Sequence, residues 1–315
     1  MFSFLDEIFY SIYQPKNIKK LILSFIFLFG ATIAFAQNAD SVVVKKEGSL
    51  GVNFANVGLS NWAAGGENSI SLGTVYYTKY TRTKGAVKWV HQVDFALGGA
   101  KVGEQSFRKT DDNIILTSSY SHKFKPNWAY SAVAVFRTQL LEGQTFAADP
   151  NNPGGEIATK ISNFLAPGYL NLNLGFTYDP NDRFTAQFAP AAGKVTLVMD
   201  DALAANGDFG VTPGENVRYE FGANIVLTTS LPIAENISFK GAATFFSNYE
   251  TFGNVDTNID MLLTAKVNDW FNASAGLQLI YDDDILIAQG DGTFSREIQL
   301  KHVINMGLNF SLFQK

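Results

Sequence analysis

The chain has 315 residues, of which 46% are hydrophobic, 14% aromatic and 17% charged, with a formal net charge of −5. Charged residues make up about 25% of a typical soluble protein, so little charged surface is expected, while the apolar content argues against disorder. The negative balance gives no indication of nucleic-acid binding. The sequence has no Cys, which excludes disulfides and thiolate metal sites, and its three His are too few for most His-based metal sites.

The N-terminal region has the organisation of a secretory signal peptide. Two Lys precede an apolar stretch at 21–36, which ends in the small-x-small sequence AFA. This stretch is short for a membrane span and is interrupted by Ser, Gly and Thr. We therefore predict a signal peptide over 1–36, cleaved after Ala36.

Beyond this point, apolar and polar residues alternate with a period of two, which is typical of strands with one apolar and one polar face. We predict twelve strands, in chain order at 50–58, 68–80, 87–98, 113–124, 128–139, 168–178, 183–199, 217–230, 237–248, 257–268, 271–281 and 297–312. In 183–199 the apolar register changes phase around Pro190 and Gly193, so we expect one long strand with a bulge.

The connections alternate between short and long. The short ones are at 81–86, 125–127, 179–182, 231–236 and 269–270, and those between them are mostly longer. Outer-membrane barrels have an even number of strands, short periplasmic turns and longer extracellular loops. Aromatic residues beside the short turns resemble an interfacial girdle rather than a hydrophobic core, which would not gather them at one end: Tyr80, Trp89, Phe124, Trp128, Tyr178, Phe184, Trp270 and Phe271.

Formal charges fall on the less apolar face of the predicted strands. A soluble barrel with an apolar interior is the alternative, but side chains just fill a barrel of about eight strands, and twelve enclose more. An apolar face turned to lipid removes this difficulty, because a closed barrel leaves no unpaired edge. We therefore predict an all-β protein with a single transmembrane antiparallel β-barrel of about 12 strands over 50–315, preceded by a short periplasmic segment at 37–49.

The last predicted strand carries a pattern that resembles the C-terminal β-signal by which outer-membrane barrels are recognised for assembly. The pattern consists of Asn305, Gly307, Phe310 and Leu312. It departs from the signal in one respect, since two residues follow Phe313, whereas many such barrels end on the aromatic residue. The resemblance implies the barrel-assembly machinery as a partner during biogenesis.

Candidate residues for chemistry are few. Nucleophilic hydrolysis needs a base beside a Ser, but the three His lie on the lipid-facing register or near a short turn, so we predict neither an enzyme nor a cofactor. Acidic residues gather at the long loops, with Asp282, Asp283 and Asp284 as weak candidates for a divalent cation. Solvated loop charge is the alternative interpretation, because EF-hand spacing is missing.

Five sequence blocks are similar to those of one family of outer-membrane proteins of Bacteroidota, catalogued only as a domain of unknown function. They are NWAAGGENSISL (61–72), FRKTDD (107–112), RTQLLEG (137–143), FLAPGYL (164–170) and YDDD (281–284). The resemblance implies a barrel in the outer membrane and no activity. All five lie at the predicted long-loop end, where Trp62 and the loop 140–167 are expected either to fold into the mouth or to brace the rim.

Two function classes follow from the predicted barrel. Its charged lumen is a passage for small polar or anionic solutes, or the barrel is a non-catalytic accessory subunit of a larger outer-membrane assembly. Predicted lumen-lining charges are Asp94, Arg137, Arg218, Glu220, Lys240, Asp260, Lys266 and Lys301. The basic residues outnumber the acidic ones, so an open lumen is expected to favour anions. The expected surroundings are outer-membrane lipid, lipopolysaccharide and other outer-membrane proteins.

Overall fold

The computed structural model describes residues 42–58, 67–152, 155–285, 287–289 and 293–314. The chain divides into two units, Met1–Val42 and Val43–Lys315, and the described residues other than Val42 belong to the second. The predicted signal peptide and Trp62 lie outside the described residues. Among the residues that are described, no helix has the length and hydropathy needed to cross a membrane.

In the described part of the chain, twelve strands form one closed antiparallel barrel, which confirms the predicted fold. The order around the barrel is β1-β16-β13-β12-β11-β10-β9-β8-β5-β4-β3-β2. The bounds are β1 (Val42–Val57), β2 (Ser69–Lys84), β3 (Val87–Val102), β4 (Arg108–Lys125), β5 (Trp128–Thr138), β8 (Gly168–Asn181), β9 (Phe184–Leu197), β10 (Val217–Ala234), β11 (Ile237–Asn248), β12 (Asp256–Lys266), β13 (Phe271–Tyr281) and β16 (Gln299–Gln314).

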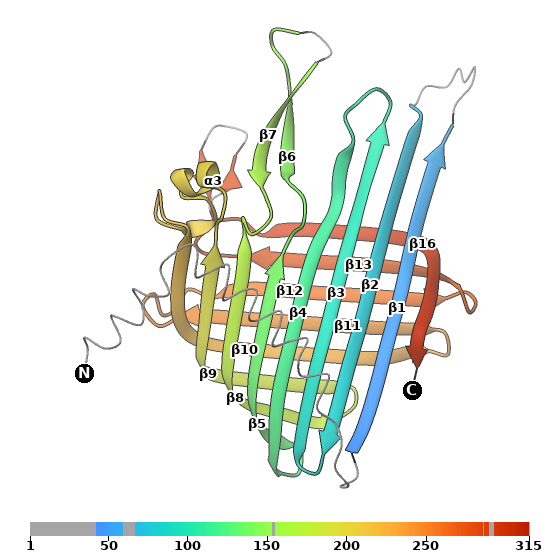
Figure 1. Cartoon of the computed structure of the whole chain (residues 1–315), viewed down its shortest axis with the longest axis vertical. Helices are drawn as coiled ribbons and strands as arrows, with labels where there is room; N and C mark the ends of the chain where they lie inside the picture. The colour runs from blue at the N-terminus through green and yellow to red at the C-terminus, as the bar shows by residue number, and fades with distance from the viewer. Residues whose placement is uncertain (1–41, 59–66, 153–154, 286, 290–292, 315) are drawn as a thin grey trace. The chain divides into compact units, whose positions relative to one another are not determined.

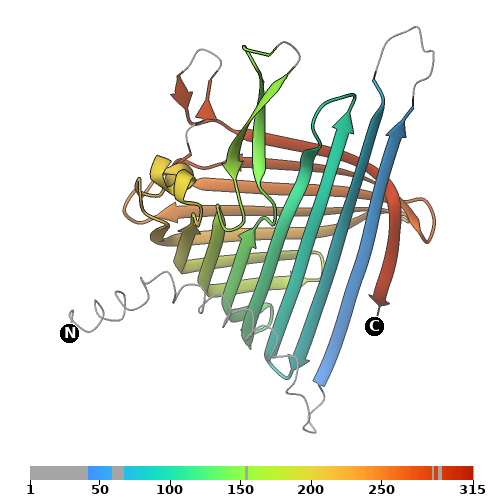
Figure 2. The same cartoon turned by 45° about the horizontal axis from the view of Figure 1, so that its top comes forward.

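All twelve predicted strands are present, and the main differences lie at their ends. β1 begins at Val42, inside the segment 37–49 that was expected to precede the barrel. β3 and β4 are longer than predicted, so the connection between them shrinks to residues 103–107. In Figures 1 and 2 the wall formed by β1–β5 crosses the wall formed by β11–β16. Crossing walls are expected where barrel strands are tilted by about 35–45° from the axis.

The two faces of the barrel wall have opposite polarity. Residues directly opposite each other on paired strands share a face, and one such row runs Asp94, Ile115, Arg137, Tyr169, Thr196 and Arg218. In β8, Leu172 and Leu174 are 44% and 57% exposed, whereas Asn173 between them is 3% exposed and accepts a hydrogen bond from the Asn224 amide. The polar residue is therefore inside and the apolar residues are outside.

β9 is continuous and bulged, as the sequence predicted. Its pairing with β10 shifts where Gly222 faces Ala192 and Asn224 faces Ala189, and its pairing with β8 shifts at the same place. Two β9 residues, Pro190 and Ala191, thus occupy the space of one, which suits a residue that cannot donate to the ladder. The bulge changes the phase of the strand, so Lys194 faces the interior.

Aromatic side chains are in contact with one another near the short turns. Ring centroids lie 4.8 Å apart for Trp89 and Tyr120, 4.4 Å for Phe124 and Tyr130, and 4.9 Å for Trp128 and Tyr178. These residues belong to the outer face, as expected for rings at the level of lipid headgroups.

The long connections at the other end carry further structure. A hairpin of β6 (Gly143–Ala148) and β7 (Glu156–Ser162) extends from the rim. It points away from the barrel in both views, so the β6 and β7 strands of the loop 140–167 do not fold inward (Figures 1 and 2). The connection after β9 forms α3 (Asp201–Asn206) and the 3-10 turn η1 (Asp208–Gly210), and that after β13 holds the short pair β14 (Ile287–Ala288) and β15 (Phe294–Ser295).

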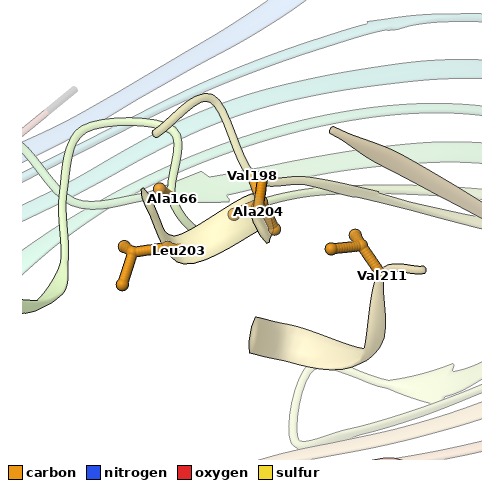
Figure 3. Close-up of a cluster of buried hydrophobic side chains, with 5 residues drawn as sticks. All are labelled: Ala166, Val198, Leu203, Ala204 and Val211. Carbon is orange, nitrogen blue, oxygen red and sulfur yellow. The ribbon is translucent and has the colours of Figure 1, made fainter. Parts of the chain in front are cut away.

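A small hydrophobic core holds the α3 connection in place. Figure 3 shows its residues, which are Ala166, Val198, Leu203, Ala204 and Val211. Phe209 packs against them. Two capping residues limit the helix to a short segment. Asp200 is the N-cap, and Gly207, with φ of 75°, ends the helix in the left-handed conformation. The core joins two loops that are far apart in sequence.

Candidate functional site

The long-loop rim is braced by hydrogen bonds between the blocks that resemble the family. The Asp112 carboxylate accepts from the backbone N–H groups of Leu140 and Leu141, both at 2.8 Å. Lys109 Nζ donates to Asp112 and to the Leu141 carbonyl, both at 2.9 Å. The Thr138 hydroxyl donates to the Pro167 carbonyl at 3.1 Å. For the blocks FRKTDD, RTQLLEG and FLAPGYL, the contacts brace the rim.

A second brace ties the hairpin to the α3 connection. Lys160 of β7 donates to the Asp200 carboxylate at 2.5 Å, and the Asn163 amide donates to the same oxygen at 3.1 Å. These bonds favour the ionised carboxyl group and hold the pKa of Asp200 at about 2. The same carboxylate caps α3 through the Leu203 N–H. One side chain therefore connects the hairpin and the helix.

Below the α3 connection, Lys194 is the centre of a buried ion-pair network. Its Nζ lies 2.6 Å from Asp256, 3.4 Å from Asp282 and 3.5 Å from Glu220. Arg218 lies 3.2 Å from Glu220 and 2.5 Å from Asp284. Two cations, from β9 and β10, thus meet four carboxylates, from β10, β12 and the segment after β13. The network has an excess of two negative charges and crosses the interior.

The arrangement gives the metal candidates other partners. Carboxylate oxygens of Glu220, Asp256 and Asp284 lie within 4.8 Å of one another. However, Lys194 and Arg218 already place their positive charges against these oxygens. Asp283 points elsewhere, to Arg296 at 3.3 Å. Because a divalent cation would have to displace Lys194 and Arg218, we assign no metal to Asp282, Asp283 or Asp284.

A second group of interior charges is basic. The Asp94 carboxylate, which accepts from the Gln92 amide at 2.8 Å, lies within electrostatic range of Lys79, Arg137 and Lys240. The excess here is two positive charges. Lys240 Nζ lies 5.5 Å from the centroid of the Tyr77 ring, a cation–π distance. Four barrel strands separate β11 from β2 on one side and six on the other, so this contact spans the lumen.

Above this group is a polar cavity of about 240 Å³ at the mouth of the barrel. It is lined by Lys109, Thr110, Asp111, Asp112, Asn113, Arg137, Gln278 and Lys301. Lys301 pairs with Asp111 across the mouth at 3.1 Å, and Lys109 pairs with Asp112. No hydrogen bond or ion pair joins the Arg137 side chain to any residue that the structure describes. The cavity therefore holds one cationic side chain that is not neutralised by a direct partner.

The remaining predicted residues lie outside the ion-pair groups, and Asp260 adjoins the mouth cavity through Gln278. Asp260 accepts from Asn258 and Gln278 at 3.1 and 2.7 Å, and Lys266 pairs with Asp269 at the short-turn end. In β16, Phe310 and Leu312 are exposed on the outer face, while Asn305 and Gly307 belong to the inner face. A side chain at Gly307 would overlap Asn53 on β1, so this glycine permits close strand approach.

Sequence reasoning missed Lys194, Tyr77 and Asp111 as interior residues of interest. The phase change in β9 hid Lys194, although the apolar register of Val195 and Leu197 was a signal that placed it inside. The His91 ring nitrogen lies 3.1 Å from the Ser118 hydroxyl. The His91 ring also stacks with Tyr80 and Trp89 on the outer face, and no pattern in the sequence predicts this arrangement.

Comparison with known proteins gives a family match for part of the chain. Residues 54–144 match the family described as "Protein of unknown function (DUF3078)". This segment runs from β1 to β6 and includes the FRKTDD block. The match supports the resemblance to a family of unknown function over that segment. No curated protein matches the chain.

Solved structures give distant likenesses. The translocator domain of autotransporter NalP from Neisseria meningitidis is 9% identical, with 95% of this chain and 99% of that chain covered and a TM-score of 0.38. The NanC porin is 9% identical, with 84% and 100% covered and a TM-score of 0.37. The Pseudomonas putida toluene transporter TodX is 12% identical, with 89% and 91% covered and a TM-score of 0.34. Likenesses at this level transfer no function.

Proposed function

We propose that this chain is a β-barrel of the bacterial outer membrane through which small polar solutes pass, with a preference for anions. The closed barrel with its apolar outer face and polar interior supports a location in lipid, because each barrel strand has hydrogen-bonded neighbours and many large apolar side chains are exposed on the outer face. The resemblance to a Bacteroidota family suggests the kind of Gram-negative envelope in which it works.

The observation that carries the functional proposal is the basic group around Arg137. Lys79, Arg137 and Lys240 surround a single carboxylate, Asp94. The acidic excess is held elsewhere, in the Lys194 network, where each carboxylate has a cationic partner. A solute that enters through the mouth cavity therefore meets a net positive potential, and rings of charge of this kind select ions in pores.

The location is tested by fractionation. The protein is expected in the outer-membrane fraction, and the unboiled protein is expected to migrate faster than the boiled protein on a denaturing gel, as closed barrels often do. Recovery as a soluble periplasmic protein would contradict the proposal.

Conduction is tested with the purified protein in a planar lipid bilayer. Under a salt gradient, the reversal potential is expected to show a preference for anions, and Arg137→Glu is expected to reduce that preference. Arg183→Glu is the matched control, because Arg183 is exposed in the turn between β8 and β9. An unchanged reversal potential in Arg137→Glu would remove Arg137 from the path.

A second candidate function is an accessory subunit of an outer-membrane assembly. The observation in its favour is the projecting β6–β7 hairpin, on which Ile157 and Ile161 are exposed. Because the hairpin does not fold inward, removing residues 145–160 is expected to leave conductance unchanged. Absence of conductance in both the full chain and the trimmed chain would favour the accessory role.

A further inference from the structure

We propose that the mouth cavity is a discrete binding site for a small oxyanion of the carboxylate or phosphate class, with Arg137 as its central residue. This inference deepens the proposed function and rests on it, since the cavity lies on the route proposed for solutes. It goes further because a bound anion at one place differs from a general preference for anions along the lumen.

The first support is the balance of direct ion pairs in the cavity. Lys109 is paired with Asp112, and Lys301 with Asp111. Arg137 is left as the one cation in the lining without a direct partner among the described residues. A charge in a confined site is costly when it has no partner. The ligand that would pair with Arg137 is therefore expected to have a net charge of about −1.

The second support is the chemistry of the lining. The guanidinium group presents a planar fork of N–H donors that matches a carboxylate or phosphate with two parallel hydrogen bonds. Thr110 and Asn113 line the same cavity and carry a hydroxyl and an amide group, which can also donate. The Gln278 amide nitrogen donates one N–H to Asp260 and has a second N–H. Since ligand pockets for drug-sized molecules measure about 300–1,000 Å³, a cavity of about 240 Å³ suits a small ligand.

The third support is the position of the surrounding charges. On the inner side of Arg137, Asp94 is shared with Lys79 and Lys240, so it does not neutralise Arg137 alone. Lys194, by contrast, lies 3.5 Å or less from three carboxylates. An anion is therefore repelled from the Lys194 network, and the cavity at Arg137 is where the interior favours it.

The experiment measures binding without conduction. Inorganic phosphate and acetate are titrated separately into the folded barrel in a zwitterionic detergent, and binding is followed by calorimetry at fixed ionic strength. Saturable binding of one probe to one site is expected, and the tighter probe identifies the class. Arg137→Gln is expected to weaken that binding at least tenfold, and Arg137→Lys less, because Lys keeps the charge but loses the fork. Arg183→Gln is the control.

Folding of each variant is checked by its gel migration before heating. If Arg137→Gln does not fold, Gln278→Ala replaces it, with an expected weakening of severalfold. No saturable binding of either probe, or equal binding by wild type and the cavity variant, would overturn the site. Binding without conductance would leave the site intact and refute the passage. Anion-preferring conductance without binding would do the reverse.

Discussion

Two adjacent residues of β12 test which face of the barrel meets lipid. Met261 and Leu262 lie at the middle of a strand that runs from Asp256 to Lys266, so they share a depth and differ in facing. Met261 is paired with Gly241 on the outer face, and Leu262 is paired with Lys240 on the inner face. We predict that Met261→Arg destabilises the folded barrel more than Leu262→Arg does.

The size of the difference follows from the surroundings of each position. An Arg on the lipid face near the bilayer midplane costs about 2–4 kcal/mol. Leu262 is 41% exposed, so an Arg there keeps its charged end in a wet lumen. Its main cost is repulsion by Lys240, about 0.8 kcal/mol for unit charges about 5 Å apart in water. The expected difference in unfolding free energy is about 1–3 kcal/mol.

The assay is reversible unfolding from phospholipid vesicles by guanidinium chloride, followed by Trp fluorescence. The shift in midpoint at constant slope gives the change in unfolding free energy. Met261→Gln and Leu262→Gln separate the effect of charge from the loss of the apolar side chain. An equal or larger cost for Leu262→Arg would show that the polar face looks outward, and the membrane location would then be untenable.

Three further predictions concern assembly, conductance and the rim. Phe310→Ala combined with Leu312→Ala is expected to lower the yield of folded, membrane-inserted protein severalfold, because the pair belongs to the proposed assembly signal. Lys240→Ala is expected to raise single-channel conductance, since it removes a contact that spans the lumen. Protection of the β6–β7 amides from hydrogen exchange is expected to be constant above about pH 4 and to fall between about pH 4 and 2. The reason is that the pKa of Asp200 is lowered, so its carboxylate stays ionised and bonded to Lys160 until the pH falls into this range.

Each of these has a control. The control for the assembly signal is Leu300→Ala with Ile304→Ala, which changes two outer-face residues of the same strand that are more exposed than Phe310 and Leu312, at 61% and 78%. An equal loss of yield in this control would mean that β16 holds no special signal. Lys266→Ala removes an exposed cation at the short-turn end, and a similar conductance gain would separate the effect from the Lys240 contact. Asp200→Asn should expose the hairpin at neutral pH, and full protection in that variant would refute the brace.

The fold was predictable because the strands carry a strong signal. Alternation of apolar and polar residues defined all twelve strands, and the short turns defined which strands pair. The ends of the strands were less predictable. Residues that were predicted to form the β3–β4 connection extend the ladder through pairs such as Ala100 with Arg108, and these small or polar residues do not alternate with apolar ones. The hairpin β6–β7 was missed because its pattern is weak and it pairs only with itself.

The site was predictable in composition and not in contacts. The period of two predicted that Arg137, Arg218 and Glu220 lie on the inner face. Which charges neutralise each other depends on the tilt and register of the strands around the barrel, and the period does not determine these. Asn173 illustrates the limit. The alternation marks it as an inner residue that should tolerate a charge, but the structure buries it against Asn224, so a large charged side chain there would disrupt packing.

The separation of charge inside the barrel explains how a chain with a net charge of −5 can still favour anions. At physiological ionic strength the Debye length is about 8 Å, so charges on the outer loops contribute little to the potential along the lumen. Inside, the acidic excess is fixed beneath the α3 connection by Lys194 and Arg218, which hold the carboxylates in place. The basic excess surrounds Asp94 directly below the mouth cavity. An entering solute is therefore attracted by a few nearby side chains, of which Arg137 is the one left without a direct partner among the described residues.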